Sequence, residues 1–326
     1  MFIKWLVVLF VIGAAGTAFG DNKKQESEAL VLRALELSNI RAEGATSFTV
    51  TAKFQVANGS SGISGTYSEI WMSKDKWIRE VTMGNSRRLE IANGRKKWLL
   101  DQDLNPRYFT TLTSALTMAG PAKGTKAKNA RSTEVDGISA RCVGFDGLYA
   151  KEIYCIDPKD GTLMTRRRIE NLGSKSPVTI SYGNYEKLGE HLFPREMQYR
   201  DDAQDSLDIR VSKLSFEVAV DASDFIPPAG SLEMANCDEN QMKAPSAIFE
   251  PEPQFPAGTG ADRAITTLSL VVGADGKPGL IHVTRSGGTA FDVQAVRAVR
   301  EWKFRPATCQ GLKTAATIAI EIEFHR

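Results

Sequence analysis

The strictest pattern in the chain lies near its carboxyl end, where apolar and polar side chains alternate from Thr317 to His325. The apolar positions are Ile318, Ile320, Ile322 and Phe324. Because successive side chains of a strand point to opposite faces of a sheet, this alternation predicts a strand with one buried and one exposed face.

An amphipathic helix is predicted just before this strand, within the stretch 290–306 and ending before Pro306. Its apolar face is formed by side chains at helical spacing: Phe291, Ala295, Ala298 and Trp302. Charged residues lie between them, so the helix is amphipathic, with one face turned to a core. Thr289 with Asp292 is predicted to cap its start. Pro306 stands where no helix continues.

A hairpin is predicted farther upstream. Apolar residues alternate with polar ones over residues 268–272 and again at 281–283, on either side of a turn that contains Asp275 and Gly276. Glycine is free to take the positive φ that such a turn requires. A hairpin, a helix and a last strand together predict a small α+β module.

These residues resemble the TonB C-terminal domain family. The resemblance rests on Pro253-Gln254-Phe255-Pro256, on Asp275-Gly276 and above all on the run from Val296 to Pro306. Domains of that family are the periplasmic modules by which energy transducers bind outer-membrane receptors. The resemblance implies no catalytic group, and a core marked by Trp302, Phe304 and Pro306.

In that family a short receptor segment pairs with the last strand by strand addition. Carried onto this sequence, the peptide-docking edge is residues 314–324. Its positions are Thr314, Thr317, Ile318, Ala319, Ile320, Glu321 and Glu323. The expected partner is an envelope protein such as an outer-membrane receptor. An open edge also permits self-pairing, so a homodimer is a second expected assembly.

The amino-terminal residues predict export. Lys4 precedes an apolar run over residues 5–19, and small residues stand at Ala18 and Gly20, as in a secretory signal peptide. We therefore expect a leader over residues 1–20 and a periplasmic location. An uncleaved inner-membrane anchor is an open alternative, although the run is short for a membrane span of about 20 residues.

The length of the chain allows two domains with cores of their own. With 326 residues, 42% hydrophobic and 25% charged, the composition is that of a globular protein. The predicted domains are 21–228 and 251–326, joined by a linker over 229–250. A net charge of +2 gives no reason to expect nucleic acid as a partner.

Four cysteines in an exported chain indicate two disulfides. Cys142 and Cys155 are equidistant from the middle of a predicted hairpin, so they face each other across two strands. Cys237 and Cys309 remain, and joining them would close a loop of some seventy residues, worth about 4 kcal/mol in the chain-entropy model. Two free buried thiols are the alternative for this second pair.

Residues 21–228 predict a curved antiparallel sheet wrapped around helices. Helices are expected over residues 25–40 and 108–119, and strands separated by turn-forming pairs fill most of the rest. This order resembles the LolA and LolB-like half-barrels of lipoprotein carriers. The resemblance implies an apolar cavity for an acyl ligand, and its candidates are Trp71, Trp77, Trp98, Phe109, Leu112 and Leu116. Ordinary core filling is the alternative role for these six side chains.

The sequence contains no residue pattern that is typical of a catalytic, metal-binding or phosphate-binding site. The histidines, His191, His282 and His325, share no metal-ligand spacing with acids or cysteines, and no nucleophile elbow or phosphate-cradling glycine loop occurs. We therefore expect no enzyme, no cofactor and no metal.

Two basic stretches, residues 123–131 and Arg166-Arg167-Arg168, are left over from this search. They are either solvated charge or a surface that attracts anionic lipid headgroups or an acidic partner. Two functions are thus open for the chain: docking through its carboxyl-terminal module, or lipid carriage in its half-barrel.

Overall fold

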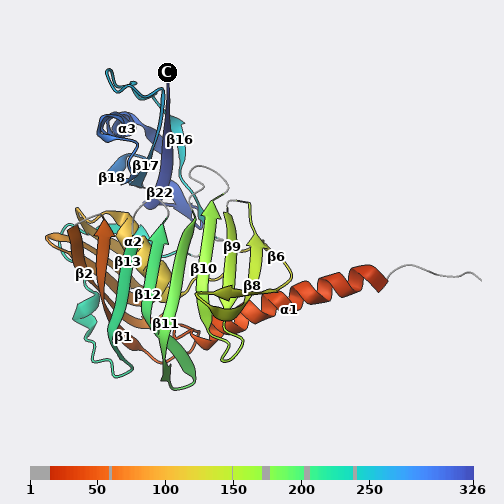
Figure 1. Ribbon diagram of the computed structural model, residues 1–326. Coiled ribbons are helices and arrows are strands. Elements are labelled where there is room, and N and C mark those ends of the chain that lie inside the picture. The colour runs from red at the N-terminus through yellow and green to blue at the C-terminus, as the bar shows by residue number, and fades with distance from the viewer. Residues whose placement is uncertain (1–14, 59–60, 149, 171–176, 202–205, 238–240) are drawn as a thin grey trace, which may run out of the picture. The chain divides into compact units, whose positions relative to one another are not determined.

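The computed structural model describes residues 15–58, 61–148, 150–170, 177–201, 206–237 and 241–326. The chain divides into two compact units, and the second is built from segments 39–119 and 182–326. The first comprises the described parts of segments 1–38 and 120–181. Both units combine open antiparallel sheet with helices, which confirms the predicted α+β class (Figure 1).

The first unit is a set of short antiparallel strands in contact with helix α1 (Ala15–Leu37). Its strand order is β6-β8-β9-β10-β11, and β7 pairs with β8. The strands are β6 (Lys126–Ala127), β7 (Arg131–Val135), β8 (Ile138–Asp146), β9 (Ala150–Ile156), β10 (Leu163–Glu170) and the beginning of β11 (Val178–Leu188). Cys142 lies directly opposite Cys155 in the β8–β9 register, and the two form the predicted disulfide.

Helix α1 begins earlier than the predicted helix over residues 25–40 and ends at Leu37. The prediction followed the apolar spacing, which starts only downstream of residue 25, whereas backbone hydrogen bonding continues through the residues before it. Most of the predicted leader, residues 1–14, lies outside the described residues. In the described part of the chain, no helix is long and apolar enough to cross a membrane.

The second unit contains a larger antiparallel sheet with the order β14-β5-β4-β3-β2-β1-β13-β12-β11. Its strands are β1 (Phe48–Asn58), β2 (Ser61–Ser73), β3 (Lys76–Met83), β4 (Ser86–Asn93), β5 (Lys96–Gln102), β12 (His191–Asp201), β13 (Ser206–Ser215) and β14 (Leu232–Ala235). The short helix η1 (Ala222–Phe225) contacts β4 and places Phe225 on Leu89 and Ile91.

Helix α2 (Pro106–Thr117) buries one apolar stripe in the second unit. Its start is fixed by Asn105, whose side-chain oxygen accepts a hydrogen bond from the Arg107 backbone N–H at 3.0 Å, and by Pro106 in the first turn. The buried stripe includes Phe109, Leu112 and Leu116. The helix thus begins two residues before the predicted start, at an Asn-Pro signal that the apolar spacing alone did not mark.

The carboxyl-terminal part of the second unit forms a three-stranded sheet, β18-β17-β22, with helix α3 beside it. The elements are β17 (Arg263–Val272), β18 (Pro278–Arg285), α3 (Thr289–Glu301) and β22 (Ala316–His325). Their core consists of Leu268, Leu270, Val272, Phe291, Ala295, Val299, Phe304, Ile322 and Phe324. The predicted hairpin, helix and last strand are therefore all present.

Short strands surround this sheet. They are β15 (Met242–Lys243), β16 (Ser246–Phe249), β19 (Lys303–Arg305), β20 (Ala307–Cys309) and β21 (Leu312–Thr314). Strand β16 pairs with β19, and β15 pairs with β20. The segment expected to be a linker, 229–250, therefore contains three short strands, β14, β15 and β16, each paired with another part of the second unit.

The start of α3 differs from the prediction. Gly288, not Thr289, is the N-cap residue, and no side chain caps the helix. Asp292 does not cap the helix. Its carboxylate accepts hydrogen bonds from the Gly287 backbone N–H at 3.0 Å and from the Thr266 hydroxyl at 2.9 Å. The carboxylate thereby ties the helix to β17 and to the preceding loop, and it supplies the acceptor that the fully buried Thr266 hydroxyl needs. The helix also ends at Glu301, five residues before Pro306.

Gly276 closes the β17–β18 hairpin in a conformation that only glycine takes easily. Its φ is +83°, and a Cβ placed there would lie 2.2 Å from the Phe304 carbonyl oxygen. The Gly276 carbonyl oxygen itself accepts a hydrogen bond from the Phe304 backbone N–H at 3.0 Å. The turn is thus hydrogen-bonded to β19, the strand that follows α3.

We expect Gly276→Ala to lower the free energy of unfolding by about 2–4 kcal/mol, since left-handed strain and a backbone clash add together. Gly258→Ala is the matched control, because Gly258 has a φ of +75° but nothing within 4 Å of its Cβ position. Left-handed strain alone predicts about 1 kcal/mol there. Urea unfolding of both variants measures the difference, and equal losses would show that the Phe304 contact is unimportant.

Candidate functional site

Strand β22 forms one edge of the carboxyl-terminal sheet. It pairs with β17 from Ala316 to His325 without a register shift. Among the residues that the structure describes, β17 is its sole strand partner, because the sheet order is β18-β17-β22. The other side of β22 therefore carries a row of backbone groups without a strand partner.

The direction of these backbone groups follows from the register. The Arg326 backbone N–H donates to the Asp262 carbonyl oxygen at 3.1 Å, so residue 326 points its backbone groups toward the β17 side. Backbone groups alternate between the two sides of a strand, and the register is unbroken. Thr317, Ala319, Glu321 and Glu323 therefore point their N–H and C=O groups away from β17.

The same four residues also expose their side chains, whereas Ile322 and Phe324 are buried in the core. Ile318 and Ile320 are half-buried and pack against that core. Six of the predicted docking positions, from Thr317 to Glu323, thus lie on β22, with their polar members on the accessible face.

Thr314, the seventh predicted docking position, does not lie on β22. It belongs to β21, where it lies opposite Ala307, and its hydroxyl oxygen accepts a hydrogen bond from the Ala235 backbone N–H at 2.7 Å. Ala315 is buried against Leu99 and Met234. Residues 314 and 315 are therefore held by β14 and β5, and the accessible edge begins only at Ala316.

The residues predicted as the module core surround the end of α3. Trp302 caps the helix, and its indole N–H donates to the Pro251 carbonyl oxygen at 3.1 Å. Phe304 is buried, with its ring 6.0 Å from that of Trp302. Pro306 is half-buried between β19 and β20. The Trp302 side chain thus links the segment at Pro251, before the module, to the end of α3.

The second predicted disulfide, Cys237–Cys309, is also present. It joins the segment after β14 to the end of β20, at a sequence separation of 72 residues. Neither cysteine of the pair is free, so the alternative of two buried thiols is wrong.

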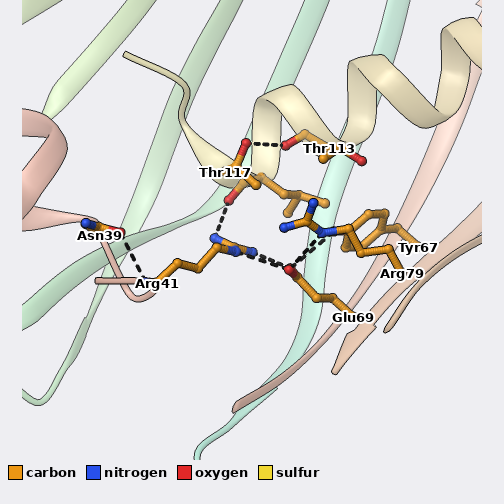
Figure 2. Close-up of polar contacts among 8 residues, drawn as sticks. Asn39, Arg41, Tyr67, Glu69, Arg79, Thr113 and Thr117 are labelled. Carbon is orange, nitrogen blue, oxygen red and sulfur yellow. Dashed lines mark hydrogen bonds and ion pairs between the residues drawn. The ribbon is translucent and has the colours of Figure 1, made fainter. Parts of the chain in front are cut away.

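A buried ion network occupies one face of the larger sheet. Arg41, from the turn before β1, and Arg79 of β3 converge on the Glu69 carboxylate of β2, and the Tyr67 hydroxyl donates to the same carboxylate at 3.1 Å (Figure 2). Arg41 Nη1 also donates to the Leu116 carbonyl oxygen at 3.0 Å. That carbonyl lies in the last turn of α2, where a cation is favoured by the helix dipole.

The network continues across the sheet through the strand register. Glu69 faces Arg79, Arg79 faces Glu90, and Arg88 faces Asp101. Arg88 is buried and donates to Asp101 at 2.8 Å and to Glu90 at 3.2 Å. Charges therefore alternate in sign from strand to strand, which is how a buried face tolerates them.

The electrostatics of Glu69 show that it stays ionised. Burial alone raises its pKa, but the neighbouring Arg41 and Arg79 guanidinium groups and their hydrogen bonds outweigh burial and lower the pKa from 4.5 to about 2. Burial also raises the pKa of Tyr67. Neither group exchanges a proton near neutral pH, so the network is suited to holding the sheet and α2 together rather than to acid–base chemistry.

The six predicted cavity residues do not share one location: the three tryptophans lie on both faces of the larger sheet, and the other three residues lie on α2. Trp71 faces Trp77 across β2 and β3, and its ring stacks on Phe48 at 5.4 Å between centroids. Trp98 lies on the opposite face, because it pairs with Ile91, whereas Trp77 pairs with the next residue, Ala92. It packs there beside Phe225.

The three candidates on α2, Phe109, Leu112 and Leu116, are buried, and the Arg88 guanidinium lies 5.2 Å from the Phe109 ring centroid. Trp98 is thus separated from the other five, which contribute to packed parts of the second unit.

Sequence reasoning missed the ion network. A signal was present, because Glu69 stands between Tyr67 and Trp71 at the inward positions of an alternating strand. A charged residue at such a position must find a partner. Which partner it finds depends on strand register, and no spacing in the sequence reveals that Arg41 and Arg79 meet it. In the described part of the chain, no group of acids, histidines and cysteines is arranged to hold a metal ion.

Comparison with known proteins identifies the carboxyl-terminal module. The family model for the Gram-negative bacterial TonB protein C-terminal matches residues 263–325, which run from the start of β17 to the end of β22. Over these residues the module matches the TonB C-terminal domain family. The match begins after the Pro253–Pro256 run and includes Trp302, Phe304 and Pro306. No curated protein matches the chain.

Solved structures resemble a larger part of the chain. A LolA superfamily protein from Nitrosomonas europaea is 12% identical, with a TM-score of 0.42, and the match covers 61% of this chain and 99% of that one. A DUF1329 family protein from Desulfovibrio piger is 10% identical, with a TM-score of 0.45, and the match covers 63% of this chain and 97% of that one.

The ion network predicts a pH-dependent stability. A carboxylate whose pKa is lowered by folding stabilises the fold above the unfolded value of 4.5, and this contribution is lost as the pH falls toward about 2. Glu69→Gln leaves two guanidinium groups without their partner. We therefore expect it to lower the free energy of unfolding at pH 7 by about 3–5 kcal/mol, and by much less at pH 3.

Urea unfolding of the wild-type protein and the variant at both pH values measures this change. The control is Glu186→Gln, because Glu186 is also paired with an arginine, at 2.6 Å from Arg195 Nε, but is exposed. Its loss should be small at either pH, since exposed ion pairs contribute little. A pH-independent loss in Glu69→Gln would contradict the assigned charge state.

Proposed function

We propose that this chain is a cell-envelope docking protein whose TonB C-terminal domain binds an extended segment of an outer-membrane partner by strand addition to β22. The observation that carries the proposal is the open edge of β22, where the alternate residues Thr317, Ala319, Glu321 and Glu323 point their backbone groups outward and also expose their side chains. An added strand would pair with these backbone groups, each hydrogen bond contributing about 0.5–1.5 kcal/mol.

The side chains on the edge favour a particular class of peptide. Glu321 and Glu323 are exposed, and Glu323 is bridged by His325 at 3.1 Å and by Arg263 at 3.6 Å. Glu321 has no partner among the ion pairs of the described residues. A lysine or arginine opposite Glu321 would be paired across the strands, so a basic partner segment is preferred. The same charges discourage two copies of β22 from pairing with each other.

The proposed setting is the periplasm, and the chain would reach it through the leader predicted over residues 1–20. Two disulfides support an oxidising compartment, because such bonds persist outside the cytoplasm. The proposed domain organisation keeps a docking module, 251–326, after a larger domain, 21–228. Transmission of force from an inner-membrane motor is no part of the proposal, since the sequence has no long proline-rich linker.

Lipid carriage in the half-barrel gains no specific support from the side chains suggested for it. Trp71 and Leu112 are buried in packed surroundings, Trp98 lies on the other face of the sheet, and the face beneath Phe109 carries the charged Arg88. Docking through β22 is therefore the function that the geometry supports best.

Proline substitutions on β22 test strand addition. Proline removes a backbone donor and is tolerated on an edge strand where that donor faces away from the sheet. We expect Ala319→Pro and Glu321→Pro to abolish binding of a basic, extended ten-residue peptide from the periplasmic amino terminus of an outer-membrane receptor. Stability should fall little, because both N–H groups point away from β17. Fluorescence anisotropy with a labelled peptide measures binding.

Two further variants complete the design. Ile320→Pro removes a donor that points to β17, so it should destabilise the domain strongly. Ala319→Ser keeps the backbone donor and should bind like the wild-type protein. Tight binding by a folded Ala319→Pro variant would overturn strand addition at β22, and a dimer lost in that variant would assign the edge to self-pairing.

A further inference from the structure

The first unit contains a groove that the docking function does not use. It has a volume of about 760 Å³, within the size range of small-molecule sites. Residues of β7, β8, β9, β10 and the beginning of β11 line it, together with the segment before β7. All of these residues belong to the first unit.

Strand register shows which side chains form the floor. Gly144 faces Ile153, which faces Arg167. In the next row, Cys142 faces Cys155, and the two are joined by a disulfide. Because neighbours across strands share a face, Gly144, Ile153 and the disulfide form one continuous apolar strip.

The other face of these strands is a different surface. Phe145 and Tyr154 alternate with the floor residues along β8 and β9 and are almost fully buried. The groove is thus outside the apolar core of the first unit, on the face that this core leaves accessible.

Gly144 makes the floor hollow. Its neighbours are the Lys128 side chain, at 3.6 Å from the position of a Cβ, and the Glu152 carbonyl oxygen, at 4.0 Å. These are ordinary contact distances, and Gly144 has no positive φ, so a Cβ fits there without strain. The glycine therefore leaves room beside the Lys128 side chain, and part of a ligand would use that room.

Cations surround this strip. Arg131 faces Cys142 across β7 and β8, Arg167 faces Ile153, and Lys151 faces Ile169 across β9 and β10. All three are exposed, and none takes part in an ion pair among the described residues. They come from the two basic stretches that the sequence singled out and from β9, which lies between β8 and β10.

The carboxylates of the groove do not neutralise these three. Asp146 is paired with Lys128 at 2.8 Å, and Glu152 is held by Arg166 at 2.6 Å. Glu134 and Asp136 lie at the β7–β8 turn. Arg131, Lys151 and Arg167 thus stand around the apolar floor, on β7, β9 and β10, without an ion-pair partner among the described residues.

We propose that this groove binds an anionic lipid, with its phosphate held by Lys151 and Arg167, which stand on neighbouring strands, and its acyl chain lying over Gly144, Ile153 and the Cys142–Cys155 bond. The charges match a phosphate, for which arginine offers paired donors. The apolar strip matches an acyl chain. Free phosphate would use the cations and leave the strip exposed, and an acidic peptide would leave its apolar surface without a partner.

Binding is measured by isothermal titration calorimetry on the delipidated full chain. The probe is myristoyl lysophosphatidylglycerol below its micelle-forming concentration, and we expect one site per chain. Myristoyl lysophosphatidylcholine, with the same chain and no net charge, should bind at least about tenfold more weakly, as should inorganic phosphate. Equal binding of phosphate alone, or binding of an acidic peptide in place of the lipid, would overturn the proposal.

Two groove variants separate the headgroup from the acyl chain. Arg167→Glu should weaken binding by about tenfold or more, because it replaces an attraction by a repulsion. Its control, Lys213→Glu, makes the same change of net charge at an exposed cation of β13. Gly144→Leu fills the floor and should abolish lipid binding, whereas Gly62→Leu, on an exposed position of β2 with its nearest neighbour at 3.8 Å, should have no effect.

Thermal unfolding verifies that each variant is folded. Unchanged lipid binding in folded Gly144→Leu would overturn the proposed path of the acyl chain. The receptor-peptide assay at β22 is a separate readout, so loss of lipid binding with retained peptide binding, or the reverse, distinguishes failure of one proposal from failure of the other.

Discussion

The unbroken ladder between β17 and β22 is the constraint on which the docking surface depends. Every residue of β22 from Ala316 to His325 has a partner on β17, so the orientation of its backbone groups is set along the whole strand. A single bulge would reverse the alternation and turn Ala319 or Glu321 toward β17. The core beneath, with Phe291, Ile322 and Phe324 in contact, makes such a slip costly because it would move buried side chains to the surface.

Buried charge imposes a different kind of order on the larger sheet. Glu69, Arg79 and Glu90 occupy facing positions on three neighbouring strands, and each carboxylate has arginine or lysine partners. An isolated charge at any of these positions would be strongly destabilising, so the strands must align in one register for the charges to meet. Arg41 extends this condition to the last turn of α2. The network thus contributes to specifying one arrangement of the sheet and its helix.

Local patterns predicted much of this structure. The alternation from Thr317 to His325 marked β22, and the symmetry of Cys142 and Cys155 about a turn marked their bond. The place of Thr314 was not predictable in this way, because its removal from the edge depends on the distant Ala235. The anchoring of Asp292 by Thr266, and the placing of Arg131, Lys151 and Arg167 around one groove, likewise depend on distant parts of the chain, which no local spacing encodes.

The Cys237–Cys309 bond changes how mechanical load would travel through the second unit. Tension entering from the amino-terminal side would cross the bond directly to Cys309, a few residues before β22. The intervening β17, β18 and α3 would be bypassed by the covalent path, so pulling on a docked partner would load the hydrogen bonds between β22 and that partner before it stretched the helix or the hairpin. The sheet edge, rather than the core beneath it, would then set the force at which a partner is released.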